Sequence, residues 1–152
     1  MFFAREMSVT NIIILSILIT VCVSGITFKL ISHLGGWALL AEPYRITEPF
    51  SGSKWKFESA QMRYLTRYNH CLTVGADPRG LYLSMYFLFQ ISHPPLFIPW
   101  RDISFSRKSF LRFKYVEFHL GREVTIPFRI SDRLAEKLKS AAGASWPTEA
   151  LS

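Results

Sequence analysis

The sequence predicts an α+β fold: an N-terminal transmembrane helix, then a bent antiparallel sheet or open barrel of about seven strands, closed by a C-terminal helix. Three observations carry this prediction. Residues 7–28 form a stretch of 22 residues without a charged side chain. Between residues 57 and 130, apolar and polar residues alternate with a period of two, which is typical of strands with one buried face. Residues 132–142 instead repeat with the period of an amphipathic helix.

The uncharged stretch predicts a single-pass membrane anchor over residues 1–33. At a rise of about 1.5 Å per residue it reaches about 33 Å, enough to cross a hydrocarbon core of about 30 Å. Glu6 and Lys29 close it on either side. The anchor residues are Ile12, Ile13, Ile14, Leu15, Ile17, Leu18, Ile19, Val21, Val23, Ile26 and Phe28.

Two other interpretations of this stretch stay open. A cleaved signal peptide would use the small residues at 23–25, but apolar sequence continues beyond that site. A lipoprotein signal would end at Cys22, but Val21 stands where a small residue is expected. The length and the charged flanks favour the uncleaved helix.

The charge distribution indicates on which side of the membrane the domain lies. The formal net charge is +7, and from Lys29 onward there are 17 Lys and Arg residues against 10 Asp and Glu residues. Positively charged flanks are retained in the cytoplasm. The flank before the stretch carries Arg5, whereas the flank after it carries Lys29, Arg45, Lys54, Lys56, Arg63 and Arg67. We therefore expect a cytoplasmic domain, at the inner membrane if the protein is bacterial, and anionic headgroups would attract such a basic domain.

The sequence of residues 34–53 predicts an interfacial helix followed by a linker. Trp37, Leu39, Leu40 and Tyr44 suggest a short amphipathic helix at the membrane interface, where Trp and Tyr rings are favoured. Pro43 indicates that this helix ends early. The segment 48–53, which contains Pro and Gly, reads as a turn-rich linker.

The remaining domain, residues 54–143, reads as strands followed by one helix. The predicted strands are 57–64, 72–74, 81–86, 96–100, 103–107, 115–120 and 124–130. Pro127 cannot donate a ladder hydrogen bond, so it must face an edge or a bulge. Ser131 or Asp132 caps the helix, and Gly143 ends it. The tail, residues 144–152, is expected to be flexible.

Over about residues 55 to 143, the chain resembles the pleckstrin-homology-like fold, including the GRAM-type domains of uncharacterised bacterial single-pass membrane proteins. The resemblance rests on the strand count, the closing helix and the segment PLFIPWRDI at 95–103. It implies a bent sheet whose open mouth meets ligands. The chain departs from it in one respect, because residues 132–142 contain no Trp, where such domains typically bury one. Phosphoinositide binding is therefore not transferred to this chain.

No pattern of catalytic or metal-binding residues is visible. The four His residues are not spaced as metal ligands, and His70 and Cys71 are neighbours in a strand, so they point to opposite faces. The Gly35–Gly36 pair lacks the Lys and Ser or Thr of a phosphate loop. We expect a protein that is not an enzyme, with no cofactor and no metal.

Two basic segments are the candidate contact sites. The first is the turn at 63–70, and the second is the segment 107–114 between the fifth and sixth strands. Their candidate contacts with headgroups or a partner are Arg63, Arg67, Arg107, Lys108, Phe110, Arg112, Phe113 and Lys114. The competing interpretation is a hairpin whose apolar residues pack inward. The apolar segment 86–95 is expected to be core beneath a loop; if exposed, it would form a patch for protein or lipid.

These features favour a membrane-anchored, non-catalytic interaction module that binds a protein partner. One alternative is an anionic-lipid surface sensor that uses the basic and aromatic loops. A second alternative is an enzyme acting on a small molecule in a barrel pocket. The expected partners are the lipid bilayer and a protein. Nucleic acid is not expected, and homo-oligomerisation stays open.

Overall fold

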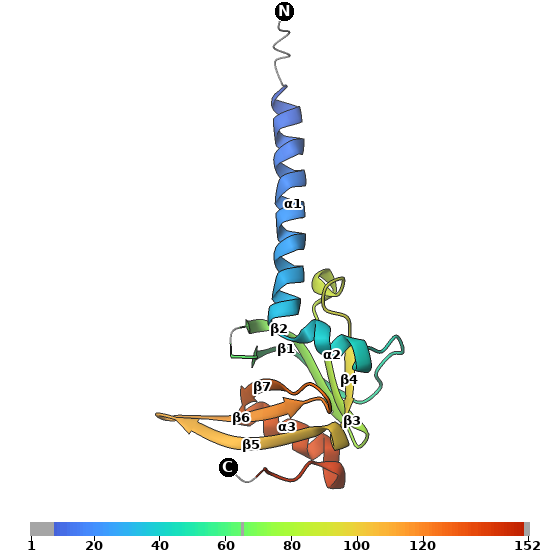
Figure 1. The fold of residues 1–152 in the computed structure, drawn as a ribbon, viewed down its shortest axis with the longest axis vertical. Helices are drawn as coiled ribbons and strands as arrows, with labels where there is room; N and C mark the ends of the chain where they lie inside the picture. Colours follow the sequence, from blue (N-terminus) through green and yellow to red (C-terminus); the bar gives the residue numbers. More distant parts are fainter. Residues whose placement is uncertain (1–7, 65, 151–152) are drawn as a thin grey trace, which may run out of the picture.

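The structure is a computed structural model and describes residues 8–64 and 66–150 (Figure 1). The helices are α1 (Val9–Leu34), α2 (Trp37–Tyr44) and α3 (Asp132–Ala142). The strands are β1 (Ser53–Met62), β2 (Thr66–Asp77), β3 (Gly80–Met85), β4 (Leu96–Pro99), β5 (Ile103–Phe110), β6 (Phe113–Leu120) and β7 (Ile126–Ser131). Three short 3-10 turns lie at Phe87–Phe89, Trp100–Asp102 and Gly143–Ser145.

The seven strands form one antiparallel sheet in the order β4-β3-β2-β1-β7-β6-β5. Consecutive strands pair except β4 and β5, which are the two edges of the sheet, and the two halves of the sheet join where β1 pairs with β7 through Gln61 and Met62 alone. The sheet curls into a half-barrel, and α3 packs against β2, β6 and β7 (Figure 1). The predicted fold class is confirmed.

The strand bounds differ most at the first and second strands. The first strand, expected at 57–64, is Ser53–Met62. The expected strand 72–74 is in fact Thr66–Asp77, because bulges in β1 and the left-handed backbone of His70 (φ 51°) interrupt the period-two pattern. The seventh strand begins at Ile126 rather than at residue 124. Pro127 lies beside the end of β1, where its carbonyl accepts the N–H of Arg63 at 2.9 Å.

The core lies between the concave face of the sheet and α3. Val116, Phe118 and Leu120 of β6 are fully buried, as alternation predicts. On α3, Leu134 and Leu138 face them from the apolar side of the helix. The Ser131 hydroxyl accepts the Leu134 N–H at 3.2 Å, which satisfies one free donor at the helix start.

Helix α2 covers the other end of the half-barrel. Trp37 and Leu40 are 0% and 1% exposed and belong to the domain core, so these two side chains face the domain, while the interfacial position of the helix stays a prediction. The Trp37 indole N–H donates to the Pro94 carbonyl at 2.9 Å, which ties α2 to the segment before β4. The turn from α1 into α2 requires Gly36, whose φ is +85°. A short and well-packed connection therefore joins α1 to the domain.

The tail packs through Ala150, which differs from the expected flexibility. The Trp146 ring lies 5.4 Å from that of Trp100 and 5.3 Å from that of Phe105. The Ala150 N–H donates to the Phe105 carbonyl at 2.7 Å, so the tail pairs with the outer edge of β5. The half-buried Trp146 ring, packed on two core aromatic rings, outweighs the loose composition of the tail.

Helix α1 is long and apolar enough to cross a membrane, and it is the one such helix in the described residues. Its apolar side chains are exposed along most of its length, and none of its most apolar window is buried against the domain. It leaves the domain as a single projecting helix (Figure 1).

Candidate functional site

The two basic segments predicted from sequence meet at one groove. Arg67 comes from β2, just after the β1–β2 turn, and Phe110 and Phe113 come from the β5–β6 hairpin. The groove has a volume of about 690 Å³. We call it the basic groove and define it by Gln61, Arg67, Phe110, Phe113, Tyr115 and Arg129. Two Arg residues and no carboxylate line it among the described residues.

The hairpin presents its aromatic residues outward. Strands β5 and β6 pair up to Phe110 and Phe113, and the turn places Leu111 in the left-handed region (φ 57°). Phe110, Leu111 and Phe113 are 68%, 84% and 73% exposed, so inward packing of this hairpin is wrong. The hairpin extends beyond the core that α3 covers, and its end forms an exposed apolar tip with cations on both sides.

The cations of the hairpin divide into two groups. Arg107 pairs with Asp132 at 2.8 Å and with Glu136 at 3.1 Å, and Lys108 pairs with Glu117 at 3.3 Å. In the part of the chain that the structure describes, no carboxylate lies within ion-pair distance of Arg112 or Lys114. These two cations therefore remain available to a ligand.

The two Arg residues of the β1–β2 segment, Arg63 and Arg67, lie in different places. Arg67 lines the basic groove, and no described carboxylate pairs with it. Arg63 instead lies over the α1–α2 turn, where a Cβ added at Gly36 would be 2.8 Å from its Cδ. The groove therefore holds the first of these side chains and not the second.

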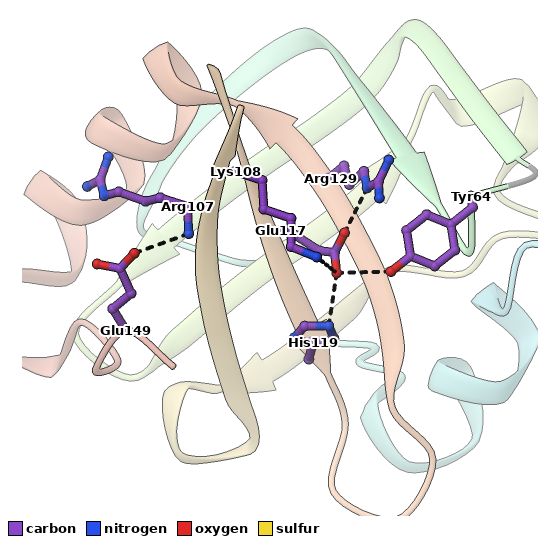
Figure 2. A network of polar contacts seen from close by, with 7 residues as sticks. All are labelled: Tyr64, Arg107, Lys108, Glu117, His119, Arg129 and Glu149. Atoms are coloured by element: carbon purple, nitrogen blue, oxygen red, sulfur yellow. Dashed lines mark hydrogen bonds and ion pairs between the residues drawn. The ribbon is translucent and has the colours of Figure 1, made fainter. Parts of the chain in front are cut away.

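A buried carboxylate beside the groove fixes Arg129 (Figure 2). Glu117 is 1% exposed although it lies on the outer face of β6. Its Oε2 accepts from Arg129 Nε at 2.7 Å, and its Oε1 accepts from the Tyr64 hydroxyl at 2.9 Å. Lys108 Nζ lies 3.3 Å and His119 Nε2 lies 3.0 Å from the same Oε1 (Figure 2).

These donors keep Glu117 ionised. Burial alone would raise its pKa, but hydrogen bonds from Arg129, Tyr64 and Lys108 outweigh burial and lower the pKa below the ordinary value. A carboxylate that stays charged and whose oxygens are occupied by donors is poorly suited to accept a proton near neutral pH. It suits a structural role, in which it holds the Arg129 guanidinium beside the groove.

Sequence reasoning did not select Tyr64, Tyr115 or Arg129 as site residues. Glu117 and Arg129 are direct partners across β6 and β7. The Arg129 guanidinium lies 4.2 Å from the Tyr64 ring centre and 4.9 Å from that of Tyr115, within cation–π range. Period-two alternation places Glu117 and Arg129 on the same outer face of the sheet. The approach of the Tyr64 ring to Arg129 depends instead on the pairing of β1 with β7.

The apolar segment 86–95, expected to be buried, is exposed in its first part and buried at His93. We call residues 86–92 the apolar loop. Phe87 is 64% exposed and Ile91 is 96% exposed. Phe89 is partly buried because it packs on α1, with its ring 4.5 Å from that of Phe28.

The loop ends at a buried aromatic cluster. His93 is fully buried, with Nε2 3.2 Å from the Tyr68 hydroxyl and its ring 5.3 Å from that of Trp37. Burial lowers the pKa of His93 to about 4 and raises that of Tyr68. Both side chains are therefore neutral near pH 7. Among the described residues, no three His, Cys, Asp or Glu side chains are grouped to hold a metal ion.

The sequence matches no protein-family model, no curated protein and no solved structure. The fold and groove define the class: an α+β protein with one long apolar N-terminal helix and a seven-stranded half-barrel domain. The resemblance to pleckstrin-homology-like and GRAM-type domains stays a prediction.

Proposed function

We propose that this chain is a single-pass membrane protein whose pleckstrin-homology-like half-barrel domain binds an acidic segment of a partner protein in the basic groove. In this proposal the domain is a non-catalytic interaction module. The charged Glu117, whose oxygens are occupied by donors, supports a binding role over proton transfer.

The composition of the basic groove carries the proposal. Exposed Phe110 and Phe113 supply apolar contact area, and Arg67 and Arg129 supply positive charge, without a carboxylate among the described lining residues. Aromatic residues and Arg are the side chains most enriched where proteins bind each other. An acidic segment with an apolar anchor residue is complementary to this surface.

The direction of the hairpin favours a protein over a lipid surface as the ligand. Strands β5 and β6 run roughly across the axis of α1, and their tip projects to the side of the domain (Figure 1). If α1 crosses the bilayer along its axis, the tip lies beside the domain and does not point at the headgroups. Arg107 and Lys108 are also engaged in ion pairs, which reduces the charge available to a lipid surface.

We propose that the domain faces the cytoplasm. Near the span, Lys29 and Arg45 follow the uncharged stretch and only Arg5 among Lys and Arg residues precedes it, and this small excess favours retention of the domain side. Reporter fusions to the C-terminus test this orientation. Activity from a reporter that works only outside the cytoplasm would contradict it.

Co-purification of the full chain after mild detergent extraction from its native host tests partner binding. The groove variant combines Arg67→Glu with Phe113→Ser. The matched control combines Lys139→Glu on α3 with Val124→Ser, two exposed positions outside the groove. We expect the wild type and the control to recover the same stoichiometric protein, and the groove variant to lose it.

Two results would contradict the proposal. One is equal recovery of the partner by the groove variant. The other is recovery of the bare chain alone, combined with salt-sensitive binding of anionic vesicles that requires Arg112 and Lys114, which would favour the lipid-sensor alternative.

A further inference from the structure

The apolar loop lies within the longest uncharged part of the domain. Residues 80–100, between Arg79 and Arg101, include no Asp, Glu, Lys or Arg in 21 positions. Much of this stretch is the buried sheet, but the loop itself is exposed: Tyr86 is 46%, Phe87 64% and Ile91 96% accessible. Large apolar side chains gathered on one exposed loop mark a contact surface.

This loop lies against the end of α1 that joins the domain. The ring of Phe89 packs on that of Phe28 with centroids 4.5 Å apart. A shallow pocket between the two elements is lined by Phe28 and Ser32 from α1 and by Phe89 and Ile91 from the loop. In Figure 1 the loop rises from the body of the domain beside the lower part of α1.

The length of α1 places this contact at a definite depth. From Val9 to Phe28 there are 20 helical residues, which at about 1.5 Å each cover about 30 Å, the thickness of a hydrocarbon core. Lys29 is the first charged residue after them. Phe28 therefore lies at the boundary between acyl chains and headgroups when α1 spans the bilayer, and the loop packed on it lies at the same depth.

We propose that the apolar loop is a second membrane-contacting element, which inserts Phe87 and Ile91 into this boundary in the leaflet next to the domain. The inference rests on the proposed span of α1, and it is independent of partner binding in the groove. The occupant is lipid, because the loop surface is continuous with the exposed apolar surface of α1. Aromatic side chains such as Tyr86 are favoured at this depth, and the loop carries no charge that insertion would desolvate.

Two contacts constrain the domain more than one does. A single helix leaves the domain free to tilt relative to the bilayer. A loop embedded beside the helix restricts this tilt, so the β5–β6 hairpin is held to the side, away from the bilayer, as Figure 1 shows it relative to α1. The basic groove then stays accessible to a partner.

Depth-dependent quenching in the full chain tests the inference. A background with Cys22→Ser and Cys71→Ser carries one new cysteine, at Ile91, Ile19 or Leu111, labelled with a fluorophore that responds to polarity. The chain is reconstituted in phosphatidylcholine vesicles whose lipids carry a nitroxide either near the headgroup or near the chain end. Each of the three positions is exposed in the structure, so the label does not disturb the core.

We expect the label at Ile91 to be quenched by the nitroxide near the headgroup, and the label at Ile19 by the one near the chain end. The label at Leu111, on the hairpin tip, serves as the aqueous control and should be quenched by neither. A label at Ile91 that behaves like the one at Leu111 would overturn the inference. So would a label at Ile91 that neither the lipid nitroxides nor an added water-soluble quencher reaches, because a protein would then cover the loop.

These measurements distinguish membrane contact by the apolar loop from the proposed span of α1 and from the proposed partner binding in the basic groove. Loss of quenching at Ile19 would show that α1 does not span, and the inference would fall with it. The groove variant Arg67→Glu with Phe113→Ser should leave quenching at Ile91 unchanged. A failure of partner binding would therefore leave the loop result standing.

Discussion

Acidification is expected to destabilise the domain through His93. This side chain is fully buried between Trp37 and Tyr68, and its Nδ1 has no hydrogen-bond partner among the described residues. A charge placed there would be desolvated, with no carboxylate among its described contacts to offset it. Protonation therefore favours the unfolded chain.

The size of the effect follows from the two pKa values. The pKa of His93 is about 4 in the folded chain, against about 6.5 in an unfolded one. At about 1.4 kcal/mol per unit, the free energy of unfolding falls by about 3 kcal/mol when protonation is complete in both states. Because the folded pKa is the lower one, this stability is present above about pH 6.5 and is lost as the pH falls toward 4.

Chemical denaturation of the full chain in detergent at several pH values measures this loss, with His93→Gln as the matched variant. The Gln amide can still hydrogen bond to Tyr68 but does not titrate. Lowered pKa values at Glu117 and Asp77 also reduce stability in acid, but they act equally in both proteins. Between about pH 7.5 and 4.5 we expect the wild type to lose about 2 to 3 kcal/mol more than the variant. Parallel profiles would refute the reasoning.

Three further predictions concern stability, each measured by equilibrium unfolding of the full chain. Glu117→Gln should cost about 2 kcal/mol, less than a fully buried ion pair because its donors are partly exposed, whereas Glu123→Gln at the exposed β6–β7 turn should cost almost nothing. An unchanged midpoint for Glu117→Gln would remove the proposed role of that carboxylate. Trp146→Ala should cost about 2 kcal/mol, since the half-buried ring packs on the core; no loss would indicate a loose tail. Gly36→Ala should cost more than about 1 kcal/mol, because φ is +85° and the new Cβ would crowd Arg63; a neutral result would contradict the observed turn.

The regular elements could be predicted because their signals are local. The uncharged stretch 7–28 and the period change at residue 131 mark α1 and α3 without reference to the rest of the chain. Alternation marks the strands in the same way, because each has one buried face. The second strand was predicted too short, since bulges in β1 and the left-handed His70 break the period there.

The groove could not be derived from local signals, because it depends on contacts between distant segments. The β1–β7 pairing through Gln61 and Met62 brings the β1–β2 turn near the β5–β6 hairpin. The basic composition of both segments was visible in the sequence. Which cations stay available was not, because Arg107 and Lys108 find their carboxylate partners only in the folded chain.

Local signals also did not distinguish the apolar side chains that are buried from those that are exposed. Trp37 and Phe87 are both aromatic residues in short apolar segments. The first is fully buried on the inner side of α2 and the second is exposed on the apolar loop. Composition does not distinguish a ring that fills the end of a half-barrel from one that extends beyond it, since only the packing of the whole domain decides which it is.

Binding of a protein in the basic groove, beside the membrane, is the property on which the proposed function depends. Photo-cross-linking from a benzophenone side chain in place of Phe113, in the full chain in its native membrane, tests this most directly. We expect an adduct with one protein, and loss of that adduct when Arg67 is changed to Glu. Adducts with lipid, or protein adducts that persist without Arg67, would contradict it.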